Sequence, residues 1–169
     1  TLGSQSWKRY LHPERQTLFR ARKASPDSER IEICEIEPEF QPRALIGLRA
    51  CDLAGMKVLG GVLATGEYAD ENFLARQRAL FVVAVGCLTP DELCFCESMG
   101  AGPEVNQGAD IVLTEIVDAS RHFFLARGLS QKGSALVDRL YPNEASPESV
   151  AEHRKRVGEA RQRMGRHLD

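Results

Sequence analysis

The sequence predicts an α/β fold, in which a single domain holds a mixed or parallel sheet flanked by helices. A cysteine loop is expected at one edge of the sheet and a basic helix at the C-terminus. Two short, unbroken apolar runs, residues 44–48 and 80–85, are typical of strands buried in such a sheet. Each run leads to a cysteine, Cys51 or Cys87, and ligands of parallel α/β sheets bind at the carboxyl ends of the strands.

Length and composition narrow the class of protein. The 169 residues suffice for one domain with a core, and the 43% hydrophobic and 27% charged fractions are ordinary for a globular protein. No apolar run reaches about 18 residues, so no membrane-spanning helix is expected. A net charge of −2 provides no electrostatic footprint for nucleic acid. Five unevenly spaced cysteines do not suit a secreted disulfide framework, so a reducing, cytoplasmic location is expected.

The first part of the chain is predicted to hold a surface segment and two strands. Residues 1–15 show no clear periodicity and are predicted to run over the surface. Two strands are predicted at 16–23 and 31–36, separated at 24–28 by a segment whose composition is typical of turns. Cys34 lies on the second strand and is interpreted as a structural residue, distinct from the other four cysteines.

The middle of the chain predicts two strand-and-helix units. Residues 43–50 form a short buried strand, and Asp52 is suited to cap a helix whose apolar residues follow at helical spacing. Two consecutive glycines, Gly60 and Gly61, weaken this helix near its end. A second, short helix is predicted at 70–79, directly before the strand 80–85.

The last part of the chain predicts a Gly-rich bend, a strand pair and two helices. The bend covers residues 98–103, the strands 111–117 and 123–126, and the first helix 133–140. Ser146 followed by Pro147 is a strong signal for a helix start. We therefore divide the chain into an α/β domain, residues 1–145, and a C-terminal helix, residues 146–169.

Four cysteines form the most informative pattern in the sequence. Cys51 follows one predicted strand and Cys87 another, and Cys94 and Cys96 lie in the loop after the second strand. Four thiolates that converge on one point suit a soft metal or an iron–sulfur cluster. Four unrelated core thiols and a zinc site remain alternatives, although a C-x-C pair is less usual for structural zinc than C-x2-C.

Other residues near the cysteines have two interpretations each. Gly100 and Gly102 offer backbone N–H groups that could hydrogen-bond cluster sulfides, or they form a tight turn. Arg49 could lower a thiol pKa or balance cluster charge, or it is simply solvated. A second arginine, Arg78, is a further candidate for such a charge. Surface positions are expected for the four histidines, which are His12, His122, His153 and His167.

The cysteine motifs resemble those of a known family. Residues 47–53, Gly-Leu-Arg-Ala-Cys-Asp-Leu, resemble the signature G-V-R-x-C-D-L, and residues 86–87 with 94–103 resemble N-C…C-F-C-x-S-M-G-T-G-P. The family is the iron–sulfur beta subunit of cytoplasmic sulfhydrogenases (hydrogenase/sulfur reductase), together with the A-type subunit of anaerobic sulfite reductase. Further matches lie at 13–19, 72–78 and 110–115.

The resemblance implies an electron-transfer role. Members pass electrons between a catalytic subunit that handles hydrogen or sulfite and a flavin-containing subunit. They typically carry two ferredoxin-type C-x2-C-x2-C-x3-C motifs C-terminal to this region, and this sequence contains none, so the helix 146–169 is expected to lead toward a ferredoxin-like module. Smaller departures are Gly86, where asparagine is usual, and residues 128–130.

Three hypotheses for function follow. The leading one is a non-catalytic electron-transfer domain that binds a 4Fe–4S cluster through Cys51, Cys87, Cys94 and Cys96. The second is a docking or scaffold domain whose cysteines are empty or zinc-bound. The third is an enzyme with Cys94 or Cys96 as nucleophile. The lack of a histidine in the same loop counts against this third hypothesis.

Overall fold

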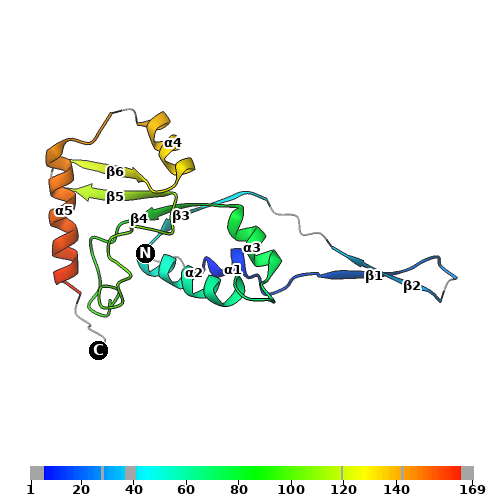
Figure 1. Ribbon diagram of the computed structural model, residues 1–169. Coiled ribbons are helices and arrows are strands. Elements are labelled where there is room, and N and C mark those ends of the chain that lie inside the picture. Colours follow the sequence, from blue (N-terminus) through cyan, green and yellow to red (C-terminus); the bar gives the residue numbers. More distant parts are fainter. Residues whose placement is uncertain (1–5, 28, 37–40, 119, 142, 165–169) are drawn as a thin grey trace.

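The main body is a four-stranded mixed sheet with helices around it. The computed structural model describes residues 6–27, 29–36, 41–118, 120–141 and 143–164. The strand order is β3-β4-β5-β6, in which β3, β4 and β5 run parallel and β6 runs antiparallel to β5 (Figure 1). The strands are β3 (Arg43–Leu48), β4 (Leu80–Val85), β5 (Ile111–Val117) and β6 (His122–Gly128). The predicted α/β class with a mixed sheet is confirmed.

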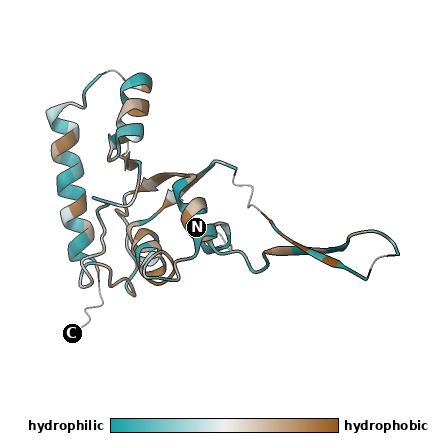
Figure 2. Ribbon diagram, turned by 45° about the vertical axis from the view of Figure 1, so that its right-hand side comes forward, coloured by the Kyte–Doolittle hydropathy of each residue, from teal (hydrophilic) through white to brown (hydrophobic). Residues whose placement is uncertain are grey.

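The helices surround this sheet. Helices α2 (Ala50–Leu63) and α3 (Glu71–Arg78) make the crossover from β3 to β4, as parallel strands require. Helix α4 (Gln131–Leu140) packs against β6, and α5 (Pro147–Gln162) stands beside β5 and β6 (Figure 1). The core between α2 and the sheet is apolar. The strands and helices that form it contain hydrophobic residues, which are coloured brown in Figure 2.

Side-chain caps explain where three helices begin. Ser146 accepts a hydrogen bond from the Ser149 N–H at 3.2 Å, as predicted, and Asp70 accepts one from the Phe73 N–H at 2.9 Å at the start of the helix predicted for 70–79. Helix α4 begins two residues earlier than predicted, because Ser130 is its cap. The predicted C-terminal helix ends at Gln162, and residues 165–169, including His167, lie outside the described residues.

Two predictions about the first half of the chain are wrong. Residues 8–11 form a short helix, α1 (Lys8–Leu11), and Leu11 is 0% exposed, so this segment contributes to the core. Four residues of helix are too short to show a periodicity. Asp52 is not the cap of α2, which begins at Ala50 after Arg49. The Asp52 carboxylate instead accepts the Arg49 N–H at 2.9 Å from within the first turn.

The strand β3 also differs from expectation. A buried strand is predicted, but β3 lies at the edge of the sheet, and Ile46 is 72% exposed while Leu45 and Leu48 are buried. An apolar run of this length does not distinguish an edge from a central strand. Helix α2 ends at Leu63, soon after Gly60 and Gly61, so the glycine pair lies near the end of the helix as predicted.

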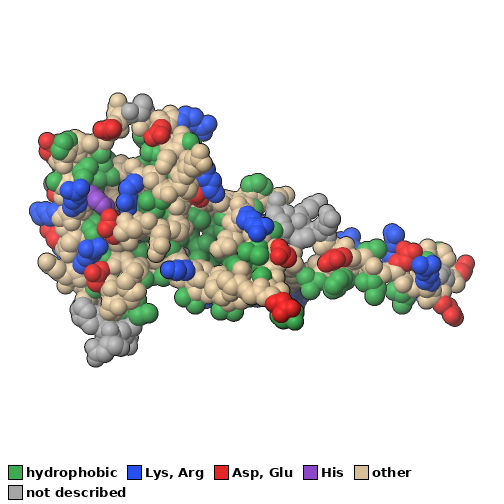
Figure 3. All heavy atoms as spheres, in the orientation of Figure 1, with side chains coloured by type: hydrophobic (Ala, Val, Ile, Leu, Met, Phe, Trp, Pro, Cys, Tyr) green, Lys and Arg blue, Asp and Glu red, His purple; other side chains and the backbone are tan. Residues whose placement is uncertain are grey.

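A two-stranded arm projects from the body. Strands β1 (Phe19–Lys23) and β2 (Ile31–Glu35) pair antiparallel in a hairpin separate from the main sheet (Figure 1). Cys34 lies on β2 as predicted, but it is exposed and does not pack in a core as a structural cysteine would. Hydrophobic side chains follow the lower side of the arm in Figure 3, and the exposed ones include Phe19, Ile31 and Ile33.

Asp110 joins three elements at the start of β5. Its carboxylate accepts the Val82 N–H at 2.8 Å and the Ser130 hydroxyl at 2.6 Å, and it lies 3.4 Å from the Lys132 ammonium. It is only 7% exposed. The first turn of α4 lies against the Asp110 backbone, and a Cβ at Gly133 would clash with the Asp110 carbonyl. Asp110 therefore fixes α4 and β5 to β4.

We expect Asp110→Ala to lower the free energy of unfolding by about 3 kcal/mol, because the Val82 N–H and the Ser130 hydroxyl lose their acceptor inside the protein. Urea unfolding followed by circular dichroism measures this. The matched control is Asp138→Ala, an exposed position on α4, with an expected change within about 0.5 kcal/mol. Equal stability of the two variants would contradict this role of Asp110.

Candidate metal centre

Two cysteines occupy the carboxyl edge of the parallel strands. Cys51 is the second residue of α2, directly after β3, and Cys87 follows Gly86 at the end of β4. Because β3 and β4 are parallel neighbours, these two ends lie at the same edge of the sheet. The structure therefore brings Cys51 and Cys87 together as the sequence predicts.

Local hydrogen bonds fold the loop after β4 back toward this edge. The Asp91 N–H donates to the Cys94 sulfur at 3.3 Å, and the Cys94 N–H donates to the Asp91 carbonyl at 3.0 Å. Further along, the Ala101 N–H donates to the Cys96 carbonyl at 2.8 Å. The Cys87 N–H meets the Pro103 carbonyl at 3.4 Å, so the two ends of the loop are side by side.

The four thiols are close enough for their charges to interact. Burial raises the pKa of the Cys96 thiol, and negative charge on Cys51, Cys87 and Cys94 raises it further. Burial likewise raises the pKa of Cys51, followed by the charge of Asp52, and Cys87 contributes in the same direction. Cys96 therefore has all three other thiols as electrostatic neighbours.

The spacing of these thiols does not match a single metal ion. Within the described ranges, no three His, Cys, Asp or Glu side chains lie close enough to hold one ion. Tetrahedral zinc with Zn–S bonds of about 2.3 Å would need sulfur atoms about 3.8 Å apart. In an iron–sulfur cluster each thiolate binds a different iron, so the sulfurs stand further apart. Four thiolates suit a cluster, in which the sulfurs need not approach one another as closely as they do around zinc.

Gly102 lets the loop approach the start of α2. A Cβ at this position would lie 2.8 Å from the Ala50 Cβ and 3.2 Å from the Cys96 sulfur, and its φ of +156° disfavours other residues. Gly100 has a φ of +60°, and its N–H donates to the Glu97 carbonyl at 3.0 Å. That bond favours the turn interpretation for Gly100, and the predicted contact of these N–H groups with cluster sulfides stays a prediction.

The two arginines proposed from the sequence lie in different places. The Arg49 guanidinium nitrogen is 3.9 Å from the Cys87 sulfur, so a positive charge stands beside one of the four thiols. Arg78 is exposed at the end of α3, just before the start of β4, whereas Cys87 follows the other end of that strand. The length of β4 separates the two, so Arg78 does not lie at the candidate site.

Helix α5 supplies contacts that the sequence did not reveal. Met164, just after α5, is 3% exposed, and its sulfur lies 3.7 Å from the Cys96 sulfur. Arg161 lies 3.5 Å from the carboxylates of both Glu97 and Glu104. The basic character of this helix is evident from the sequence, but its acidic partners in and after the cysteine loop are not. The end of α5 therefore holds the loop in place.

His153 does not occupy the predicted surface position. Its side chain is only 21% exposed, and its Nε2 lies 3.7 Å from a Glu104 oxygen. No sequence signal indicates this burial, because His153 stands among charged residues typical of a solvated helix face. His122, in contrast, is exposed as predicted and pairs with Glu115 at 2.8 Å.

Comparison with known proteins supports the resemblance to a sulfhydrogenase beta subunit. The chain is 31% identical over 134 residues to sulfhydrogenase 2 subunit beta of Pyrococcus furiosus, a match that covers 79% of this chain and 38% of that protein. The chain thus spans about two fifths of this relative. No family model matches, and no solved structure matches. In the described part of the chain, no helix is long and apolar enough to cross a membrane.

The raised thiol pKa is testable in the metal-free protein. We expect Cys96 to reach half of its maximal alkylation rate at a higher pH in the folded chain than in the same chain unfolded in urea. Burial and three neighbouring thiols disfavour its thiolate only when the chain is folded. Iodoacetamide labelling over a pH series, followed by peptide mass spectrometry, measures both midpoints. A folded midpoint at or below the unfolded one would refute the shared environment.

Proposed function

We propose that this chain is an electron-transfer domain that binds one 4Fe–4S cluster through Cys51, Cys87, Cys94 and Cys96. We further propose that it acts within a beta-type subunit of a multisubunit hydrogenase or sulfur reductase. The observation that carries the proposal is the position of Cys51 and Cys87 at the shared carboxyl edge of β3 and β4, with the loop folded back so that Gly102 lies between Ala50 and the Cys96 sulfur. The similarity to a sulfhydrogenase subunit supports the same function.

The residues of the chain have distinct parts in this proposal. The bound cluster would supply one-electron transfer. The four cysteines must lose their protons to bind iron, and the raised pKa values of Cys51 and Cys96 mean that cluster assembly becomes easier as the pH rises. Arg49 would offset part of the negative charge at Cys87. Gly102 leaves room for the loop beside Ala50.

The two alternatives receive less support. A scaffold with zinc-bound cysteines would use the same thiolate donors, but the C-x-C pair Cys94 and Cys96 is less usual for structural zinc than C-x2-C. A thiol enzyme would need a base beside its nucleophile. The contacts of the candidate sulfurs are instead the Asp91 N–H at Cys94 and the Met164 sulfur at Cys96.

The proposed partners are a catalytic subunit for hydrogen or sulfite, a ferredoxin-like module of the full-length protein, and a flavin-containing subunit. The relation to anaerobic sulfite reductase stays a prediction from the motifs. The exposed apolar side chains of the arm favour a contact with a partner protein. Ile31 and Ile33 are 63% and 73% exposed on one face of a two-stranded hairpin, which is marginally stable by itself. We propose that the flavin-containing subunit covers this face.

Replacing any one of the four cysteines by serine should remove most of the cluster. We expect Cys51→Ser, Cys87→Ser, Cys94→Ser and Cys96→Ser each to lose most of the iron after anaerobic reconstitution, because a serine oxygen is a harder and poorer ligand than a thiolate. Iron content and visible absorption report the result. The matched control is Cys34→Ser on the arm, which should keep full iron content. Full occupancy in any of the four variants would show that the ligand set is wrong.

Association through the arm can be tested separately from the cluster. We expect the double variant Ile31→Thr, Ile33→Thr to bind the co-expressed flavin-containing subunit with an affinity at least about tenfold lower, because two buried side chains lose apolar contact. Its iron content should not change. Glu32→Thr, on the opposite face of the same strand, is the control. Undiminished association of the double variant would exclude the arm as the contact.

A further inference from the structure

A polar pocket lies at the amino ends of β3 and β4, whereas the candidate metal centre lies at their carboxyl ends. Its volume is about 150 Å³, and the first residue of each strand, Arg43 and Leu80, lines it together with residues of α1 and α3. Three lining residues are arginines, namely Arg9, Arg43 and Arg76, and no Asp or Glu is among the described residues of the lining. In a chain whose net charge is −2, three arginines around one small pocket concentrate positive charge locally.

Contacts with the folded body hold the three guanidinium groups in place. The guanidinium carbons of Arg9 and Arg43 lie over the Tyr10 ring, 5.2 and 5.5 Å from its centre. Tyr10 packs against the hydrophobic core, and its neighbour Leu11 is completely buried. Arg76 donates a hydrogen bond to the Leu11 carbonyl at 3.3 Å. The arginines therefore surround the pocket before any ligand binds.

Arg76 is held close to another positive charge. Burial lowers the pKa of its guanidinium, the Asp70 carboxylate raises that pKa, and the charge of Arg43 lowers it. The Asp70 side chain caps α3 by accepting the Phe73 N–H at 2.9 Å, and it does not line the pocket. Arg43 and Arg76 therefore repel each other, and an anion in the pocket would attract both.

We propose that this pocket binds a phosphate group, either as the free ion or as a monoester at the end of a small molecule. Arginine guanidinium groups bind phosphate oxygens through paired hydrogen bonds. A phosphate group carries a charge of about −1.5 to −2 at pH 7, which suits three arginines better than the single charge of a carboxylate. Tyr10 and Gln41 also line the pocket, and their hydroxyl and amide groups are uncharged donors.

The size and the place of the pocket suit such a ligand. An engineered cavity of about 150 Å³ accommodates benzene, and a phosphate group has about as many non-hydrogen atoms. Pro13, between α1 and β1, and Gln41, between β2 and β3, both line the pocket, so the ligand would lie where the arm joins the body (Figure 1). None of the four candidate cluster ligands lines it, so binding does not depend on the cluster and is measurable in the metal-free chain.

Isothermal titration of the whole metal-free chain with inorganic phosphate, glycerol 3-phosphate and acetate, at constant ionic strength, tests the proposal. We expect saturable binding of phosphate that is at least about tenfold tighter than that of acetate, because the additional charge strengthens its hydrogen bonds to arginine. Tighter binding of glycerol 3-phosphate than of inorganic phosphate would identify a monoester as the ligand, and the reverse order would identify the free ion. Absence of saturable binding of both phosphates, or acetate affinity equal to theirs, would overturn the proposal.

Two variants and a matched control locate the site. Arg43→Gln and Arg9→Gln each remove one charge from an exposed position of the lining, and each should lower the phosphate affinity at least about tenfold. Arg78→Gln removes the same charge from an exposed position of α3 outside the lining and should change the affinity by less than about twofold. Circular dichroism verifies that each variant is folded. Equal losses in Arg78→Gln and Arg43→Gln, or undiminished affinity in both lining variants, would refute the assignment.

Discussion

Strands β3 and β4 run parallel, in a register that pairs Leu45 with Val82 and Leu48 with Ala84, and the candidate site depends on this pairing. Both strands end at one edge, so Cys51 and Cys87 meet there although 35 residues separate them in the sequence. Antiparallel pairing would have placed the two cysteines at opposite edges, about 20 Å apart for strands of this length. The buried Asp110 carboxylate reinforces the arrangement, because it ties β4 to β5 and α4.

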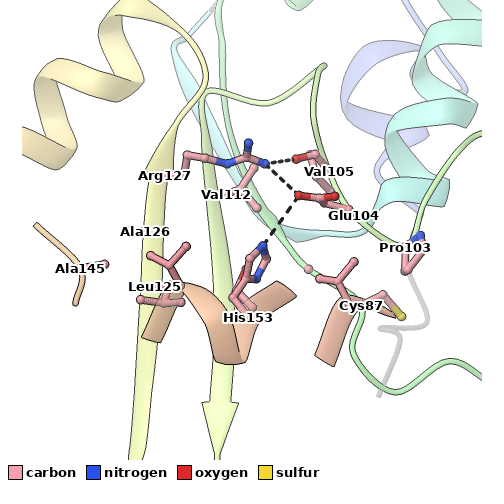
Figure 4. Close-up of a pocket in the computed structure, with 14 residues that line it drawn as sticks. Cys87, Pro103, Glu104, Val105, Val112, Leu125, Ala126, Arg127, Ala145 and His153 are labelled. Atoms are coloured by element: carbon pink, nitrogen blue, oxygen red, sulfur yellow. Dashed lines mark hydrogen bonds and ion pairs between the residues drawn. The ribbon is translucent and has the colours of Figure 1, made fainter. Parts of the chain in front are cut away.

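The cysteine loop after β4 and the end of α5 complete the candidate site, whose first two cysteines follow β3 and β4. Gly102 allows the loop to lie against Ala50, and the Met164 sulfur lies 3.7 Å from the Cys96 sulfur. Arg161 holds two carboxylates in and after the loop, which gives α5 a part in positioning the cysteines as well as in forming the adjacent cavity. This cavity has a volume of about 230 Å³ and a mostly apolar lining from β5, β6, α5 and the segment after the cysteine loop (Figure 4).

The predictable parts of the fold were those with strong local signals. The apolar run 80–85, the short helix at 70–79 and the Ser146 cap depend on a few neighbouring residues, and the structure confirms them. The edge position of β3 and the burial of Leu11 depend on tertiary packing, which no short sequence pattern records. At the site, the cysteines were predictable because their spacing is unusual. The contacts that support them were not, since Met164 and Arg161 reach the cysteine loop only because α5 packs beside β5 and β6.

The central claim is that the four thiols of the intact chain bind a 4Fe–4S cluster. Iron and acid-labile sulfide analysis after anaerobic reconstitution, with the visible spectrum of the same sample, tests it most directly. The proposal predicts about four irons and about four sulfides per chain, with a broad absorption band near about 400 nm. One zinc per chain without visible absorption, or no stably bound iron, would contradict the claim and favour a docking scaffold.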